Sequence, residues 1–197
     1  SGLIRVGAYD SVARYFFPDF LRYLRKIAPA LKVQITTERS HSILRSVRER
    51  ELDVGIIAVK GASGHRDGIF CKAMFTDTFG LYAVPNLDRA FSDQLILFPE
   101  SVGKKVEDFE SYGFHSFFTC DNLEAVKALT EENMGVGLLP HRVARQGVLS
   151  ARLERVDKPQ MDLAPHQIAL CSLEDSGGHV SEFLGELEKF LLLWSKT

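Results

Sequence analysis

Apolar and polar positions in the N-terminal third of the chain change repeatedly between the strand period and the helix period. Two short apolar runs, Leu3–Ala8 and Val54–Val59, predict buried strands, and the alternation at 31–36 predicts a strand with one solvated face. Apolar residues spaced by three and four at 13–27 and 40–47 predict amphipathic helices. Strands and helices that alternate with short connections predict parallel strands joined by right-handed crossovers.

The rest of the chain repeats this alternation less regularly. Strands are predicted at 79–84, 95–98, 117–119, 136–140, 153–156 and 167–171. Helical patterns are predicted at 106–112, 121–133, 143–146 and 180–194. The pattern as a whole therefore predicts the α/β fold class.

Individual residues predict where several helices begin, bend or end. Pro18 lies inside an apolar helical pattern and predicts a kink or a late helix start, because proline lacks the N–H group. Ser40 is of a residue type that caps the next helix. Asp121, followed three residues later by Glu124, predicts an aspartate variant of the capping box. Gly147 predicts the end of a short helix.

Composition and charge exclude some functions. The 197 residues carry a formal net charge of -2, whereas a phosphate-binding surface requires excess basic residues, so this chain by itself is not predicted to bind nucleic acid. No stretch is long and apolar enough for a membrane span, and the first residues lack the signal-peptide pattern. The three cysteines, Cys71, Cys120 and Cys171, are too few and too widely spaced for a disulfide framework. We expect three packed thiols and a reducing compartment.

Motifs of known catalytic or cofactor chemistry are absent from the sequence. There is no P-loop, no nucleophile elbow and no zinc-binding pattern, and we expect no metal and no cofactor. The nearest metal-like grouping is His65, Asp67 and Cys71, for which an ordinary loop is the favoured interpretation. An enzyme would also need a nucleophile with its base, and the sequence offers no convincing pair.

The remaining candidates are helix N-termini that directly follow strands. Ser11, Ser40 and the pair Asp121 and Asn122 hold such positions. Free N–H groups and the helix dipole favour anions there, and ligands of open α/β sheets bind at the carboxyl ends of strands. The alternative is that these residues only cap their helices.

The charges near these positions are mixed. Asp10 and Asp121 would repel a carboxylate unless Arg39, His41 or Lys60 offsets them. Cys120 lies where a helix dipole stabilises a thiolate, but Asp121 beside it opposes ionisation, so a packed or cleft-lining thiol is favoured over a redox sensor.

Three segments together resemble the effector-binding (regulatory) domain of LysR-type transcriptional regulators. The segment 17–33, with Phe17-Pro18-Asp19-Phe20-Leu21 and Ala28-Pro29-Ala30-Leu31, is similar to the family's "LP-x-L-x-x-F…YP-x-V" region. Leu52-Asp53-Val54-Gly55-Ile56 resembles its "LD-[LV]-[AG]-I" strand. Residues 122–140, "NLEAVKALTEENMGVGLLP", are similar to its most specific motif. The resemblance extends from Leu3 to about Trp194.

The resemblance implies two Rossmann-like subdomains with a hinge, as in type 2 periplasmic binding proteins. Subdomain I would comprise 3–79 and 164–197, and subdomain II would comprise 80–163. A winged helix-turn-helix DNA-binding domain would precede residue 1 and is absent from this chain.

The resemblance also implies that a small effector binds between the subdomains. The positions carried over are Tyr9, Asp10, Ser11, Val12, Arg39, Ser40, His41, Val59, Lys60, Thr119, Cys120, Asp121 and Asn122. Many members have Ser or Thr where Asp10, His41 and Cys120 stand, so an amine-bearing or neutral effector is expected here.

The sequence therefore predicts a ligand-sensing module of a cytoplasmic transcriptional regulator. It is expected to act as a homodimer or homotetramer, in which the helix at 13–27 of one copy meets that at 122–133 of another. It would reach DNA only through the missing domain, and no membrane partner is expected. The alternatives are a periplasmic solute-binding protein and an enzyme on the same fold.

Overall fold

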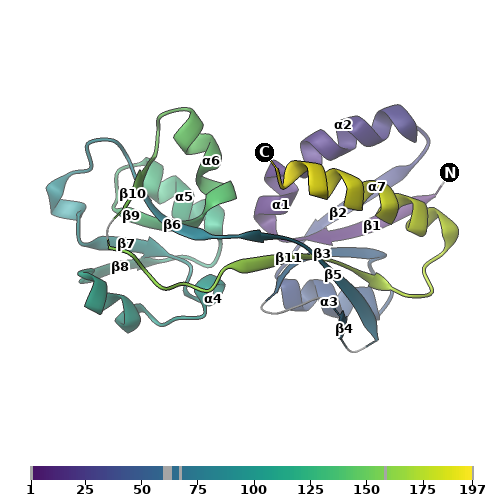
Figure 1. Ribbon diagram of the computed structural model, residues 1–197, viewed down its shortest axis with the longest axis horizontal. Helices are drawn as coiled ribbons and strands as arrows, with labels where there is room; N and C mark the ends of the chain where they lie inside the picture. Colours follow the sequence, from purple (N-terminus) through teal and green to yellow (C-terminus); the bar gives the residue numbers. More distant parts are fainter. Residues whose placement is uncertain (1, 60–63, 67, 158, 197) are drawn as a thin grey trace. The chain divides into compact units, whose positions relative to one another are not determined.

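The structure is a computed structural model that describes residues 2–59, 64–66, 68–157 and 159–196. It divides into two compact units: unit 1 comprises Ser1–Thr76 and His166–Thr197, and unit 2 comprises Asp77–Pro165. The chain passes between the units twice, once into β6 and once into β11 (Figure 1). The predicted boundaries lie two or three residues from these divisions. Among the described residues, no helix has the length and apolar character needed to cross a bilayer.

Unit 1 contains a mixed sheet with strand order β2-β1-β3-β11-β5-β4. The strands are β1 (Leu3–Ala8), β2 (Lys32–Thr37), β3 (Val54–Val59), β4 (Gly64–Arg66), β5 (Ile69–Asp77) and β11 (His166–Leu173). As predicted, β1 pairs in parallel with both β2 and β3, whereas β11 runs antiparallel to β3. The carboxyl ends of β2, β1 and β3 therefore lie along one edge of the sheet.

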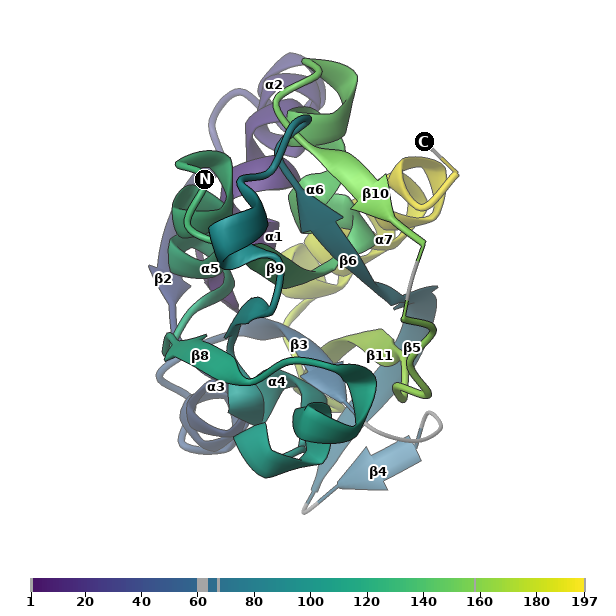
Figure 2. The same cartoon turned by 90° about the vertical axis from the view of Figure 1, so that its left-hand side faces the viewer.

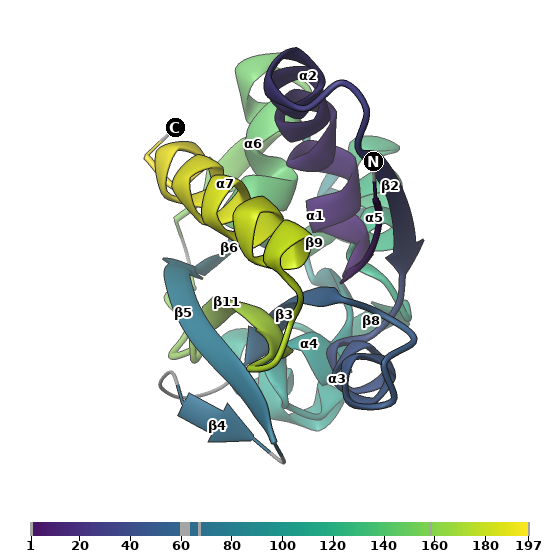
Figure 3. The same ribbon diagram turned by 90° about the vertical axis from the view of Figure 1, so that its right-hand side faces the viewer.

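Helices cover both faces of this sheet (Figure 3). They are α1 (Asp10–Tyr15), α2 (Phe17–Ile27), α3 (Ser40–Arg48) and α7 (Gly178–Trp194). One core lies between the sheet and α1, α2 and α7, where the ring of Phe20 stands 5.6 Å from that of Phe183 and 5.5 Å from that of Phe190. A second core lies between the other face and α3.

Two neighbouring glycines allow α3 to approach the sheet closely. Gly7 of β1 and Gly55 of β3 are register partners, so their missing side chains leave one continuous shallow space. A Cβ atom on Gly55 would stand 2.7 Å from Cγ2 of Ile43, and one on Gly7 would stand 2.5 Å from Cδ1 of Leu52. Any side chain at either position would therefore displace Ile43 or Leu52.

A charged pair ties the beginning of β3 to β1. The backbone N–H of Arg5 donates to Oδ2 of Asp53 at 2.8 Å, and its guanidinium donates to both carboxylate oxygens, at 3.2 and 2.8 Å. Burial raises the pKa of Asp53, but the hydrogen bonds and charge of Arg5 outweigh it and leave that pKa below its ordinary value. This aspartate of the "LD-[LV]-[AG]-I" resemblance therefore fixes the register of β1 and β3.

Unit 2 is built around a second mixed sheet, with strand order β10-β6-β9-β7-β8 (Figure 2). Its strands are β6 (Phe79–Ala83), β7 (Gln94–Leu97), β8 (Ser116–Thr119), β9 (Val136–Pro140) and β10 (Glu154–Val156). Its helices are α4 (Pro99–Val102), α5 (Leu123–Glu131) and α6 (His141–Leu149), with 3-10 turns η1 (Arg89–Phe91) and η2 (Val106–Tyr112). The α/β prediction is confirmed in both units.

The predictions made for two single residues had different outcomes. Pro18 marks a late helix start, one of its two predicted effects: α1 ends at Tyr15, and α2 begins at Phe17 with Pro18 in its first turn, where a missing N–H costs nothing. The prediction that Gly147 ends a helix is wrong, since Gly147 lies inside α6, where a Cβ would be 2.7 Å from Cδ1 of Leu153. The strands β4 and β5 were not predicted.

The prediction of three free thiols is also wrong for two of the cysteines. Cys71 of β5 and Cys171 of β11 form a disulfide between neighbouring strands, with their Cα atoms 4.2 Å apart. Both are almost fully buried. Residues separated by 100 positions were brought together by strand pairing, which no spacing pattern reveals. Of the three cysteines, only Cys120 is free.

The substitution Gly55→Ala tests the close approach of α3. The new methyl group overlaps Ile43, so we expect a loss of about 1–3 kcal/mol in the free energy of unfolding, measured by urea denaturation. Gly185→Ala in the middle of α7 is the matched control: nothing lies within 4 Å of its Cβ position. That variant should gain roughly 0.5–1 kcal/mol from helix propensity. Equal stability of the two variants would contradict the packing described above.

The disulfide is tested by counting thiols in denaturant. Without reductant one thiol per chain should react, that of Cys120, and after reduction all three should react. Because the bridge closes a loop of 100 residues, the Cys71→Ala/Cys171→Ala variant should lose about 4–5 kcal/mol of unfolding free energy relative to the oxidised protein. Three reactive thiols before reduction would show that the bridge does not form.

Candidate functional site

Four predicted site residues follow the carboxyl end of β1. Tyr9 is the N-cap of α1, and among the described residues no side chain caps this helix, so Asp10 and Ser11 are helical residues rather than caps. The carboxylate-bearing Asp10 is exposed, whereas Ser11 is buried. The side chain of Val12 packs in the hydrophobic core, so a ligand could meet only its backbone. Ser11 is the buried hydroxyl that β1 brings to this edge.

The next predicted residues lie at the start of α3. Arg39 is the N-cap, and Ser40 is the first helical residue rather than the cap that the sequence predicted. The Oγ atom of Ser40 instead accepts a hydrogen bond of 3.0 Å from the N–H group of Ala58 in β3. β1 ends at Ala8, which pairs with Ile56, so the serine hydroxyl takes the place of a strand partner for Ala58.

This arrangement leaves the α3 N-terminus with free donors. Its first turn has no side-chain cap among the described residues, and His41 beside Ser40 is exposed. The hydroxyl proton of Ser40 is not donated to any described residue. Val59 ends β3 half-buried, and Lys60 lies outside the described residues. The ends of β1, β2 and β3 thus bring Ser11, Ser40 and His41 to one edge of the unit 1 sheet.

A residue that the sequence did not single out lies at the same edge. Gln167 of β11 stands opposite Val59, one position beyond the pair formed by Ala58 and Ile168. Its Oε1 atom is buried and has no hydrogen-bond partner within the described part of the chain. A buried acceptor without a donor costs about 1–3 kcal/mol, which is a reason to expect a ligand donor there. Only the antiparallel pairing with β3 reveals this position.

In unit 2, the predicted residues surround the N-terminus of α5. The cap is Asn122 and not Asp121, since Oδ1 of Asn122 accepts a hydrogen bond from the N–H of Ala125 at 2.8 Å. The amide of Asn122 in turn donates to Oδ1 of Asp121 at 3.1 Å. Glu124 occupies the second helical position, so the predicted capping box does not form. This helix end is capped by its own chain.

Thr119 and Cys120 precede that cap. Thr119 ends β8 with an exposed side chain, and the N–H of Cys120 donates to the carbonyl of Leu97 at 2.9 Å. Burial raises the pKa of the Cys120 thiol, and the Asp121 carboxylate raises it further. Both effects disfavour the thiolate, which supports a packed thiol rather than a reactive one.

The described residues contain no group of three metal-binding side chains. The grouping of His65, Asp67 and Cys71 has lost its sulfur ligand to the disulfide, and Asp67 lies outside the described residues.

A buried carboxyl group lies at the point in the sequence where the chain passes from unit 1 into unit 2. Asp77, the last residue of β5, is only 7% exposed. Burial raises its pKa to about 6, although the Arg142 charge and the N–H groups of Arg142 and Thr78 act in the opposite direction. Its carboxyl group therefore titrates near neutral pH.

Comparison with known proteins identifies the family. A model of the LysR substrate binding domain matches residues 1–190. The uncharacterized HTH-type transcriptional regulator YeiE of Escherichia coli K12 is 21% identical over 173 residues, which cover 81% of this chain and 58% of that protein. The chain thus spans less than two thirds of this relative.

Solved structures share the fold. The effector domain of the transcriptional regulator AmpR of Pseudomonas aeruginosa has a TM-score of 0.75 at 15% identity, covering 99% of this chain and 98% of that chain. The regulatory domain of CrgA, a LysR-type regulator of Neisseria meningitidis, has a TM-score of 0.72 at 14% identity, with 98% of both chains covered. A C206S mutant OxyR2 regulatory domain of Vibrio vulnificus has a TM-score of 0.73 at 16% identity, covering 98% and 96%.

The chain has the two α/β units of the fold that these regulatory domains share. The chain belongs to the LysR substrate-binding domain family, so the predicted fold and family are confirmed. This family is one of transcriptional regulators and not of enzymes, and the alternative of a periplasmic solute-binding protein receives no support.

The substitution Asp77→Asn tests the buried carboxyl. Its folded-state pKa of about 6 lies above the ordinary aspartate pKa of 3.8, so its stabilising contribution is complete below about pH 4 and is lost as the pH rises through 6. The variant should therefore exceed the wild type by roughly 2 kcal/mol in unfolding free energy at pH 7.5. The difference should vanish near pH 4, as followed by urea denaturation across pH. A constant difference would contradict the titration.

Proposed function

We propose that the carboxyl ends of β1, β2 and β3 bind a small metabolite, the effector of a LysR-type regulator. DNA binding would belong to a separate domain, and this chain would contribute ligand sensing without catalysis. The predicted contacts from unit 2, Thr119 and Cys120, are proposed to contact the same effector. Asp121 and Asn122 are proposed to shape that part of the site through their mutual hydrogen bond.

One observation carries this proposal: an open helix N-terminus and a buried acceptor with no donor among the described residues lie at the same edge of the sheet. The α3 N-terminus and the hydroxyl groups of Ser11 and Ser40 supply donors, and Gln167 supplies an acceptor. All four belong to unit 1 and lie at the ends of adjacent strands.

The acceptor also indicates the chemistry of the effector. Oε1 of Gln167 requires an N–H or O–H donor, and Asp10 with its carboxylate favours a cation over an anion. The effector is therefore proposed to be a neutral or amine-bearing molecule with at least one hydrogen-bond donor. Its polar acceptors would meet the α3 N-terminus.

The proposed function also includes association between copies of the chain. We propose a homodimer or homotetramer in the cytoplasm, with α2 and α5 of different copies in contact. On α2, the hydroxyl of Tyr23 donates a hydrogen bond of 2.6 Å to Oε2 of Glu186 within its own chain. Its hydroxyl therefore already has a partner, and any contact would use the ring alone.

The effector site is tested by thermal-shift screening of a panel of amines, sugars, amino acids and carboxylic acids, followed by calorimetry of the hits. Ser40→Ala and Ser11→Ala should each lower the affinity for a hit by roughly five- to tenfold, since each removes one hydrogen bond. Ser46→Ala, in the same α3 helix, is the control: its hydroxyl donates to Glu51 away from the strand ends. A hit indifferent to both variants would overturn the site assignment.

Gln167→Leu gives an independent test, because it separates stability from affinity. The free protein should become as stable or more stable, since the buried acceptor is removed, whereas affinity for the same hit should fall. Loss of stability with unchanged affinity would show that Gln167 serves the fold alone.

A further inference from the structure

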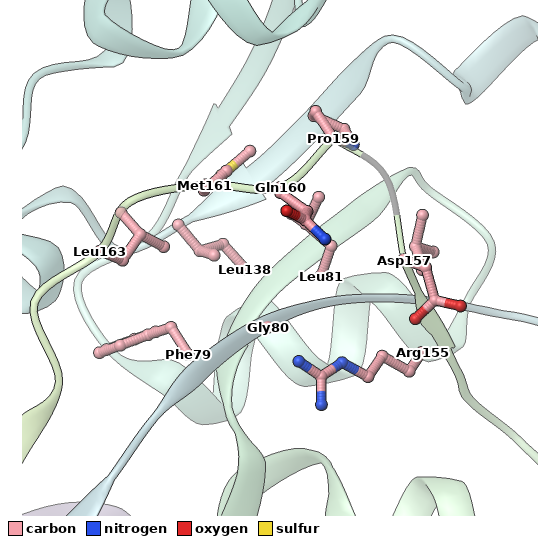
Figure 4. A pocket seen from close by; sticks show the side chains of 11 residues that line it. Phe79, Gly80, Leu81, Leu138, Arg155, Asp157, Pro159, Gln160, Met161 and Leu163 are labelled. Carbon is pink, nitrogen blue, oxygen red and sulfur yellow. The ribbon is translucent and has the colours of Figure 1, made fainter.

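A pocket of about 390 Å³ lies in unit 2, and none of its lining residues is among those assigned above (Figure 4). It is lined by Phe79, Gly80, Leu81, Leu138, Arg155, Val156, Asp157, Pro159, Gln160, Met161 and Leu163. All of these residues belong to unit 2. The volume is at the lower end of the range for ligand sites, which suits a molecule of metabolite size.

The pocket exists because the edge strand β10 is short. β10 ends at Val156, which pairs with Leu81, so no β10 residue stands beside Gly80 or Phe79 of β6. The chain then leaves the sheet, and Met161 and Leu163 return to pack against the core of unit 2. The space between the free edge of β6 and this returning segment is the pocket.

The lining is apolar on one side and charged on the other. Val156 and Leu81 face the core, and alternation along the strand turns Arg155 to the opposite face, where it stands beside Tyr82. The apolar side is formed by Phe79, Leu138, Met161 and Leu163. Arg155 and Asp157 lie on the other side, with Gln160 between the two sides (Figure 4).

Both charged groups are available to a ligand. Arg155 and Asp157 are exposed, and neither side chain forms a hydrogen bond or ion pair with another described residue. A lone carboxylate bound to Arg155 would be repelled by Asp157, and a lone amine bound to Asp157 would be repelled by Arg155. A ligand that carries both charges satisfies both residues, and its apolar part fits the other side of the pocket.

We propose that this pocket is a second ligand site, which takes an apolar α-amino acid. Its carboxylate binds the Arg155 guanidinium, its ammonium group binds the Asp157 carboxylate, and its side chain lies against the partly exposed Phe79, Met161 and Leu163. The occupant contacts the chain just after the first connection between the units, at 79–81, and just before the second, at 155–163. It therefore restrains both connecting segments, which gives the regulator a second input.

The test uses three molecules that share one apolar body: L-leucine, 4-methylpentanoate, which lacks the amino group, and 3-methylbutylamine, which lacks the carboxylate. Titration of the chain by calorimetry should show millimolar or tighter binding of L-leucine and at least roughly tenfold weaker binding of the other two. Absence of L-leucine binding, or equal binding of 4-methylpentanoate, would overturn the proposal.

Variants locate the binding. Arg155→Gln and Asp157→Asn should each lower the affinity for L-leucine by roughly tenfold or more, because each removes one charge-assisted hydrogen bond. The controls are Arg89→Gln, an exposed arginine of η1, and Asp162→Asn, an exposed aspartate of the same segment that does not line the pocket. Both controls should retain full affinity, and unchanged thermal unfolding should accompany all four exposed substitutions.

Ser40→Ala separates this site from the proposed effector site. If L-leucine binds in the unit 2 pocket, its affinity is unchanged by Ser40→Ala and is lowered by Arg155→Gln. The reverse pattern would place L-leucine at the strand ends of unit 1 and would overturn the second site while supporting the first.

Discussion

The close packing of α3 against two glycines is the constraint on which the candidate site depends. Gly7 and Gly55 stand side by side on β1 and β3, and Ile43 of α3 fills the space their missing side chains leave. Only at this short distance does the hydroxyl of Ser40 reach the N–H of Ala58, just beyond the end of β1. The same contact that closes the second core of unit 1 therefore also sets where the α3 N-terminus lies relative to the strand ends.

In unit 2 a glycine also allows a helix to pack closely on a strand, but the N-terminus of that helix is capped. Gly137 of β9 lets Thr130 of α5 pack directly on the strand, where a Cβ would come within 2.1 Å of the threonine hydroxyl. The α5 N-terminus, however, is capped by Asn122, which is held in turn by Asp121. The two units thus present unlike helix ends, an open one with donors and a closed one with an acidic rim, so unit 1 is the better candidate for the polar contacts of an effector.

Some polar groups find no hydrogen-bond partner within the described part of the chain. Gln167 keeps a buried acceptor without a donor, and Arg155 and Asp157 keep two opposite charges without partners among the described residues. Arg5 and Asp53 show the alternative, in which an equally polar pair is joined by three hydrogen bonds and serves the register of the sheet. The difference separates polar groups that hold the structure together from polar groups that the described part of the fold leaves unpaired.

The sequence by itself determined the α/β class, the parallel arrangement of β1, β2 and β3, and the family, because apolar periodicity and the motifs around Asp53 and Asn122 are local properties. It also placed Ser11 and Ser40 near strand ends. Only the tertiary structure decided the roles: Ser40 supports β3 instead of capping, Cys71 forms a disulfide with Cys171, and Gln167 and Arg155 come to lie at the proposed ligand sites. The role of Ser40 depends on the packing of α3 against the sheet. The positions of Cys171, Gln167 and Arg155 depend on pairing between strands remote in the chain, since antiparallel neighbours such as β11 and β3 are set by the whole sheet and leave no periodic signal in either strand.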